Sequence, residues 1–219
     1  MQAERRSYDE EPARTARPPT RREKERLAHR AAILDAAERV FAAKGFPGAT
    51  IAEIAREAEF AVGSIYNFFP GKRELAEAVM LRIATERVEE VEREVLPLAA
   101  ASGAAGLRAF VRVWVRHHAT HGPFLRMGME YQRSQGHREP PEAFKRLFRD
   151  YRAASERFFA EGLRAGLYRA LPAADLVRTF EGLAHEYLFE WDRAPADSRP
   201  SAAKLEERLF AVLSKLLLA

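Results

Sequence analysis

The feature that most constrains this sequence is a pair of short helices separated by a three-residue break, close to its N-terminal end. Thr50 and Glu53 have the Thr-x-x-Glu spacing of a capping box, in which each side chain satisfies a free backbone N–H of the first helical turn. They predict a helix over residues 51–58. After the break at residues 59–61, a second helix is expected over residues 62–69, because a Pro-Gly pair follows it.

A longer helix is expected before this pair, over residues 22–44. Its apolar side chains recur at the three- and four-residue spacing of one helical face, and Gly45 follows as a natural end. Two short helices behind a longer one form a helix-turn-helix, in which the last helix enters the major groove of DNA. The sequence therefore predicts a small DNA-binding unit over residues 22–72.

The second short helix and the residues after it carry a specific residue set. The set has a small-polar-aliphatic-aromatic core, an aromatic pair and a Pro-small-Lys ending: Gly63, Ser64, Ile65, Tyr66, Phe68, Phe69, Pro70 and Lys72. Through these residues, roughly residues 25–80 resemble the N-terminal domain of tetracycline-repressor (TetR) family regulators. The family's turn is usually Gly-aliphatic-Ser, whereas here it is Glu59-Phe60-Ala61, and Ala61 has no side-chain oxygen to cap the next helix.

The resemblance implies which residues contact DNA. Thr50 caps its helix, and its hydroxyl and the nearby N–H groups would face a phosphate. Tyr66 and Lys72 would supply a hydroxyl and a charge to other phosphates. Ser64 and Asn67 would read base edges, since an Asn amide can pair bidentately with adenine.

Other residues of the same helix have packing roles under this interpretation. Val62 and Gly63 would lie close to the groove, and three further side chains would face the small core, namely Ile65, Phe68 and Phe69. From the residues alone, Tyr66 as a half-buried core tyrosine and Lys72 as a solvated helix-start lysine remain alternatives.

The positive charge is concentrated ahead of the helix-turn-helix. The formal net charge is +4, and residues 14–30 hold seven Lys or Arg against two Glu, whereas residues 31–81 hold five basic against seven acidic side chains. Residues 1–21 combine charge with Pro and few aliphatic side chains, so we expect a disordered basic arm. The arm either follows DNA or only solubilises the protein.

The rest of the chain, residues 73–219, is expected to be a helical bundle, which gives an all-α protein of about nine helices. Gly122-Pro123 predicts a break between one helix and a short one over residues 124–132. The resemblance implies that this domain binds an effector and forms a homodimer. Its last two helices, at about residues 173–192 and 201–218, would pair with their mates, although their apolar faces could also complete the monomer core.

An effector pocket would lie between the middle helices of the bundle. Its candidate lining residues are aromatic, Met or His side chains at helical spacing: Phe110, Trp114, His118, Phe124, Met127, Tyr131, Phe148, Phe159 and Tyr187. Each of them could equally be plain core. Because no buried charge is evident from the sequence, a small apolar or amphipathic effector is the default.

Several classes of protein find no support. There is no Cys, so disulfides and thiolate chemistry are excluded and a cytoplasmic location fits. His117 and His121 share a helical face, but no third metal ligand is evident, and we expect neither a metal nor another cofactor. No catalytic motif and no membrane span are found.

The sequence therefore predicts a DNA-binding transcriptional regulator, a repressor released by its effector from a pseudo-palindromic operator on double-stranded DNA. The alternatives are an architectural DNA-binding protein without an effector, or an all-helical enzyme or cofactor bundle.

Overall fold

The computed structural model describes residues 20–134, 142–195 and 197–219, and the side chains in these ranges except at 127–134, 142–144, 147 and 148. Every regular element in these ranges is helical, as predicted. The elements are α1 (Arg21–Gly48), α2 (Ile51–Glu57), α3 (Val62–Tyr66), α4 (Lys72–Glu90), a π turn η1 (Val91–Val95), a 3-10 turn η2 (Leu96–Leu98), α5 (Gly103–Ser134), α6 (Glu142–Arg164), α7 (Ala173–Arg193) and α8 (Ala202–Leu217). The described residues thus form eight α-helices, close to the nine expected.

The first helix begins with a capping signal that the sequence analysis did not use. Thr20 accepts a hydrogen bond from the backbone N–H of Glu23, whose carboxylate accepts one from Thr20 in return. The helix therefore starts at Arg21. The remaining expected arm, residues 1–19, lies outside the described residues. At the other end, Gly45 has a φ of 70° and kinks the helix, and one more turn follows as far as Gly48.

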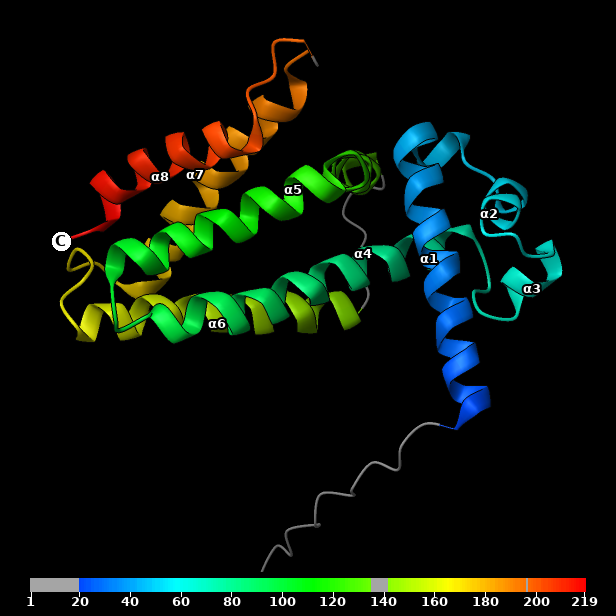
Figure 1. Ribbon diagram of the computed structural model, residues 1–219, viewed down its shortest axis with the longest axis horizontal. Helices are drawn as coiled ribbons and strands as arrows, with labels where there is room; N and C mark the ends of the chain where they lie inside the picture. Colours follow the sequence, from blue (N-terminus) through cyan, green and yellow to red (C-terminus); the bar gives the residue numbers. More distant parts are fainter. Residues whose placement is uncertain (1–19, 135–141, 196) are drawn as a thin grey trace, which may run out of the picture.

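The expected break at Gly122-Pro123 is a bend and not an end, because α5 is one helix from Gly103 to Ser134 with Pro123 inside it. Proline lacks the N–H that would bond one turn back, and its ring displaces the carbonyl there, so a helix that continues through it changes direction. Figure 1 shows this change, since the last turns of α5 are seen end-on while the rest lies across the view.

The apolar side chains form two separate cores. The N-terminal core joins α1, α2, α3 and the first half of α4, and its buried residues include Phe41, Ile54, Ile65 and Val79. The C-terminal core joins η1 and α5 to α8. The bundle of α4 to α8 lies on one side of α1, and α2 and α3 lie on the other (Figure 1).

The helix α4 contributes to both cores and so connects the two parts of the molecule. Leu75, Val79 and Ile83 are buried in the N-terminal core, whereas Val88 packs against the C-terminal core. The chain continues through η1, whose Val91 and Val95 are fully buried there. The chain then leaves this helical segment through η2, which contains Pro97.

Candidate DNA-binding site and interior cluster

The short helix α3 is buried along one side and exposed to solvent along the other. Ile65 is fully buried, and Phe69 and the half-buried Phe68 pack in the same core, as expected. On the other side, Val62 is 42% exposed and Tyr66 is 53% exposed. Three buried or half-buried side chains therefore hold the helix while its outer face stays available.

The remaining predicted DNA-contacting residues of this helix lie on or beside that face. Gly63 and Asn67 are exposed and Ser64 is half-buried. A Cβ added at Gly63 would meet no atom within 4 Å, so the monomer does not require glycine there. The helix is also shorter than expected, because it ends at Tyr66 and Asn67 is its C-cap.

The turn before α3 has the geometry that glycine favours but contains Glu59. Glu59 has a φ of 60°, in the left-handed region. Its N–H donates to the carbonyl of Arg56, and the N–H of Phe60 donates to the carbonyl of Ala55. These two bonds form a Schellman ending of α2, whose left-handed position is usually Gly. Ala61 makes no side-chain cap at the start of α3, as expected.

Thr50 begins α2 with the predicted capping box. Its hydroxyl accepts from the N–H of Glu53 at 3.2 Å, and the Glu53 carboxylate accepts from the N–H of Thr50 at 3.1 Å. Lys44 donates to the same carboxylate at 2.6 Å. Thr50 itself is exposed, so its hydroxyl and the free N–H groups of this helix start face solvent.

Lys72 is engaged within the protein. Its ammonium donates to the carbonyls of Phe46 at 2.8 Å and Ala49 at 2.9 Å, and lies 4.7 Å from the ring centroid of Phe46. These contacts tie the start of α4 to the end of α1. In this geometry the Lys72 charge holds the domain together and is not directed at a ligand.

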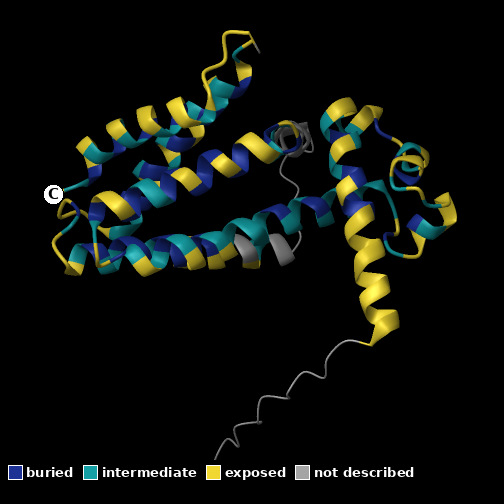
Figure 2. Cartoon of the chain, in the orientation of Figure 1, coloured by how far each residue is buried: buried dark blue, intermediate teal, exposed yellow. Residues whose placement is uncertain are grey.

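Near α3, cations that form no ion pair in the described residues lie at two places. One is Arg56, exposed on α2. The others are on the first turns of α1, where residues 20–32 are all exposed (Figure 2). This helical extension lies beside the turn and α3, because His29 contacts Phe60 edge-on at 5.1 Å and Arg30 lies 5.2 Å from the Phe69 ring centroid.

The candidate pocket residues are divided between the two cores. Phe110, Trp114, His118 and Phe159 are buried in the bundle, and Tyr187 is half-buried there. Phe124 instead packs in the N-terminal core, with its ring centroid 6.1 Å from that of Phe41, because α5 bends toward α1. The side chains of Met127, Tyr131 and Phe148 lie outside the described residues.

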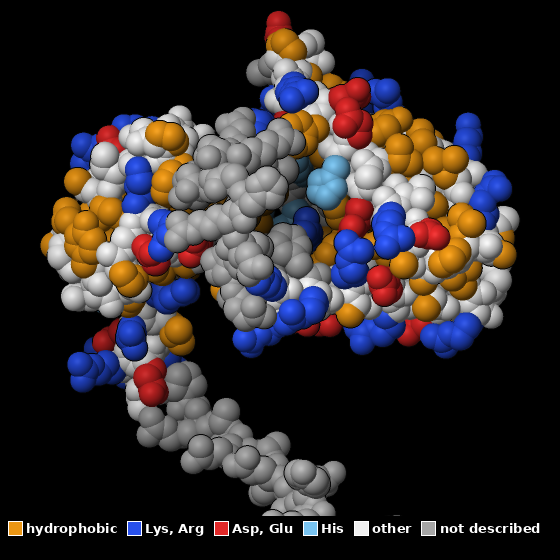
Figure 3. Space-filling model, turned by 180° about the vertical axis from the view of Figure 1, so that it is seen from behind, with side chains coloured by type: hydrophobic (Ala, Val, Ile, Leu, Met, Phe, Trp, Pro, Cys, Tyr) orange, Lys and Arg blue, Asp and Glu red, His pale blue; other side chains and the backbone are white. Residues whose placement is uncertain are grey.

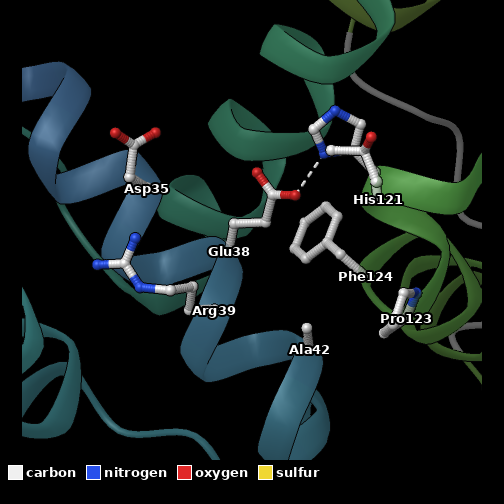
Figure 4. A pocket seen from close by; sticks show the side chains of 8 residues that line it. Asp35, Glu38, Arg39, Ala42, His121, Pro123 and Phe124 are labelled. Carbon is white, nitrogen blue, oxygen red and sulfur yellow. Dashed lines mark hydrogen bonds and ion pairs between the residues drawn. The ribbon is translucent and has the colours of Figure 1, made fainter. Parts of the chain in front are cut away.

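A crevice of about 290 Å³ lies between α1 and α5 (Figure 4). Phe124 forms one wall of it, and Glu38 bonds to His121 across it at 2.5 Å. Burial would raise the pKa of Glu38, but the bonds from His121 and from Arg82 outweigh it and lower that pKa. The crevice is therefore bridged by an ionic contact between the two halves of the molecule.

The other histidines of α5 also meet carboxylates on neighbouring helices. Nε2 of His117 lies 3.1 Å from Glu90, and Nε2 of His118 lies 2.7 Å from Asp192, which also pairs with Arg126 at 3.0 Å. Among the described residues, no three His, Cys, Asp or Glu side chains form a group that could hold a metal ion. The histidine side chains of α5 thus form contacts with carboxylates on neighbouring helices.

The bundle contains charged side chains, whereas no buried charge was evident from the sequence. Arg87 on α4 reaches into it, with its guanidinium carbon 5.1 Å from the ring centroid of Trp114 and 4.6 Å from that of Tyr151. Trp114 donates to the hydroxyl of Tyr151 at 2.7 Å. Glu181 on α7 is partly buried, and this burial raises its pKa.

An exposed short helix fixed behind a tight turn, next to a basic helix, defines a helix-turn-helix DNA-binding protein. The sequence comparisons identify the family. The family described as bacterial regulatory proteins, tetR family, matches residues 33–79. The HTH-type transcriptional regulator BetI of Cronobacter sakazakii is 31% identical over 156 residues, which cover 71% of this chain and 74% of that protein. The chain belongs to the tetR family of bacterial regulatory proteins, and it is a DNA-binding transcriptional regulator and not an enzyme.

Solved structures show the same fold along most of the chain. One is a regulator from Saccharomonospora viridis in complex with choline, with a TM-score of 0.71, 16% identity, and coverage of 88% of this chain and 99% of that one. Another is FadR of Bacillus subtilis in complex with stearoyl-CoA, with a TM-score of 0.67, 18% identity, and coverage of 84% and 96%. No helix in the described ranges is long and apolar enough to cross a membrane.

Proposed function

We propose that this regulator is a homodimeric repressor that binds a pseudo-palindromic operator through α3 and releases it when a small molecule enters the bundle of α4 to α8. The observation that carries the DNA-binding part is the face of α3, where Val62, Tyr66 and Asn67 are exposed on a helix anchored by Ile65 and Phe69. A major groove admits one such helix, and donors on it read base edges.

Within this proposal, different residues contact the bases and the phosphates. The amide of Asn67 and the hydroxyl of Ser64 contact bases, and the phenol of Tyr66 donates to a phosphate. Phosphates flanking the groove are neutralised by Arg56 and by three cations at the start of α1 that are exposed and form no ion pair in the described residues: Arg22, Lys24 and Arg26. Thr50 and the start of α2 receive another phosphate.

Base reading and phosphate contact can be separated by measuring binding of two variants to two DNAs. Asn67→Ala should weaken binding to the operator by about 1–3 kcal/mol and to random DNA much less, since a base contact is lost. Tyr66→Phe should weaken both by a similar factor, because one phosphate hydrogen bond is lost while the ring remains. Fluorescence anisotropy at one salt concentration, on DNA from beside the protein's own gene and on a shuffled sequence, gives the four affinities.

The companion variant is Asn67→Asp, which keeps the size of the side chain but replaces the N–H donor for adenine N7 with a second, negatively charged acceptor. It should bind the operator no better than Asn67→Ala. Equal losses on operator and shuffled DNA for Asn67→Ala would remove base reading from Asn67. A wild-type protein without preference for any fragment around its gene would overturn the repressor proposal and favour an architectural protein.

The dimer is proposed to form through α7 and α8. Their outer faces carry apolar side chains outside the core, including Leu216 at 46% exposure. Gly182 lies in the middle of α7, is exposed, and has no atom within 4 Å of where its Cβ would be. Because glycine inside a helix costs roughly 0.5–1 kcal/mol relative to alanine, its presence fits a close approach of a second helix.

This interface is tested by placing a large side chain at Gly182. Gly182→Leu should raise the melting temperature of the isolated subunit, because a better helix former replaces glycine, and it should shift the protein toward monomer in light scattering. Gly166 is not a suitable control position, because it has a positive φ and any other residue there would strain the backbone. Gly182→Ala is the matched control and should dimerise nearly as well. A Gly182→Leu protein that remains a full dimer would place the interface elsewhere.

The effector part of the proposal rests on how α4 and α5 join the two cores. We divide the chain into a DNA-binding unit at about residues 22–72 and an effector and dimerisation unit at about residues 73–219. Arg82 of α4 pairs with Asp35 at 2.5 Å and with Glu38 at 2.9 Å, both on α1. His121 of α5 bonds to the same Glu38.

These contacts suggest how a ligand could release DNA. A ligand that moves α4 or α5 in the bundle shifts α1, and with it α3. The solved relatives with choline and with stearoyl-CoA support a small molecule as the signal.

A further inference from the structure

Arg87 is a cation held in the bundle without an anion. It stacks near the rings of Trp114 and Tyr151, and its Nε is buried with no hydrogen-bond partner. No ion pair or hydrogen bond joins it to another residue in the described ranges. The other arginine of α4 that faces neighbouring helices, Arg82, pairs with three carboxylates, two on α1 and one on α4 itself, so Arg87 is a distinct case.

The acidic groups around Arg87 do not supply the missing charge. Asp192 is already paired with both His118 and Arg126. Glu181 on α7 makes no ion pair and no hydrogen bond with Arg87 in the described residues, and burial raises the pKa of its carboxyl. Within the described part of the chain, the Arg87 guanidinium therefore has aromatic neighbours and no carboxylate paired with it.

An uncompensated charge of this kind is costly, and the aromatic contacts offset only part of the cost. A cation–π contact stabilises a cation by less than the free energy that is lost when the ion is taken out of water. A guanidinium presents a planar fork of donors that matches a carboxylate or another oxyanion, and it is always charged. Arg87 of α4 lies against Trp114 of α5 and Tyr151 of α6, so an anion bound by it would lie beside these two rings.

We infer that the effector is an organic anion, with an oxyanion head bound by Arg87 and an apolar body packed among the aromatic side chains of the bundle. This inference rests on the proposed function, in which the bundle takes an effector, and it specifies the ligand's charge. It narrows the expected apolar or amphipathic effector to an amphipathic anion, because the structure contains a charge in the bundle that was not evident from the sequence.

A cationic effector at this place is disfavoured by the same geometry. A quaternary ammonium would use the faces of Trp114 and Tyr151, and Arg87 already lies over both rings. A second cation within about 5 Å would be repelled by it. Choline in the related structure from Saccharomonospora viridis therefore does not predict the ligand charge here. Histidine side chains are visible on the face of the molecule that Figure 3 shows.

The experiment compares two fluorescent dyes that share one ring system and differ in charge. Anilinonaphthalene sulfonate carries a sulfonate, and phenylnaphthylamine lacks it. The wild-type protein should bind the sulfonate at one site per subunit and at least about tenfold more tightly than the neutral dye, which is about 1.4 kcal/mol. Titrations are followed by dye emission in the absence of DNA.

Two variants test whether Arg87 is the source of this preference. Arg87→Met keeps an unbranched apolar stem beside the rings and should remove the preference for the sulfonate while leaving the neutral dye's affinity unchanged. Arg157→Met is the matched control, because it also removes one positive charge from the bundle but at an exposed position paired with Glu92. It should retain the wild-type preference.

Equal affinity of the wild-type protein for the two dyes would overturn the inference, and this comparison needs no variant that might unfold. A preference that survives in a folded Arg87→Met protein would also overturn it. Operator binding without dye is measured separately. Failure there, with the sulfonate preference intact, would refute the repressor proposal and leave the anion site supported.

Discussion

The strained residue Glu59 gives a prediction in which stability and DNA affinity change together. A left-handed conformation costs an L-residue roughly 1–2 kcal/mol, and Glu59 has a φ of 60°. Glycine removes this cost but adds about 0.5–1 kcal/mol of unfolded-chain entropy. Glu59→Gly should therefore stabilise the fold by about 0.5–1 kcal/mol, or roughly 1–4 °C in melting temperature for a chain of this size.

The same substitution removes a negative charge next to the recognition helix. For a phosphate about 10 Å away in water, that charge costs about 0.4 kcal/mol, or about a twofold loss of affinity per half-site before screening by salt. Glu59→Gly should thus bind DNA at least about twofold more tightly, and the gain should shrink as salt rises.

Two control variants separate the contributions. Glu59→Gln removes the charge and keeps the strain, so affinity should rise while the melting temperature stays the same. Glu59→Asn removes the charge and tolerates a positive φ, so its melting temperature should lie between those of the Gln and Gly variants. Melting is followed by circular dichroism and binding by anisotropy. A Glu59→Gly protein that melts no higher than Glu59→Gln would refute the strain argument.

Three further predictions concern other parts of the chain. Lys72→Met should lower the free energy of unfolding by about 1–3 kcal/mol in denaturant titrations, because the carbonyls of Phe46 and Ala49 lose a charged donor; unchanged stability with weaker DNA binding would place the ammonium on a phosphate. Deleting residues 1–19 removes four Arg and four acidic side chains, so a flatter salt dependence, by about 0.9 per lost contact, would show direct phosphate contacts, and an unchanged slope would make the arm a bystander. Burial lowers the pKa of His117 to about 4, whereas the unfolded chain protonates near 6.5; stability should therefore be full above pH 6.5 and be lost as pH falls toward 4, and thermal melts of His117→Gln should show a smaller loss.

Local signals along the chain were enough for the helix-turn-helix. The capping box at Thr50 and the apolar spacing each depend on a few neighbouring residues, and each appears in the structure. The Pro-Gly pair correctly separates α3 from α4, although α3 ends earlier than predicted, at Tyr66. The unfavourable turn was also visible, since Glu59 stands where a Schellman ending prefers glycine. A capping signal at Thr20 and Glu23 was present in the sequence and would have moved the start of α1 to Arg21.

Local rules failed where a long-range contact changed the outcome. Pro123 predicts an end to its helix, but the helix continues because Phe124, just after the bend, packs against Phe41 in the other core. A pattern of apolar spacing shows that Phe124 is buried and does not show which core buries it.

The sequence by itself determined the class of this protein, because helix caps, stops and apolar periodicity are properties of short segments whose energies do not depend on the rest of the fold. The tertiary structure decided which charges are available. Lys72 was predicted to contact a phosphate or solvent and instead donates to the carbonyls of Phe46 and Ala49. Arg87, which no sequence pattern indicated, lies against Trp114 and Tyr151 without an ion pair in the described residues. Whether a charge is satisfied depends on side chains brought from distant helices, and no spacing along the chain records that.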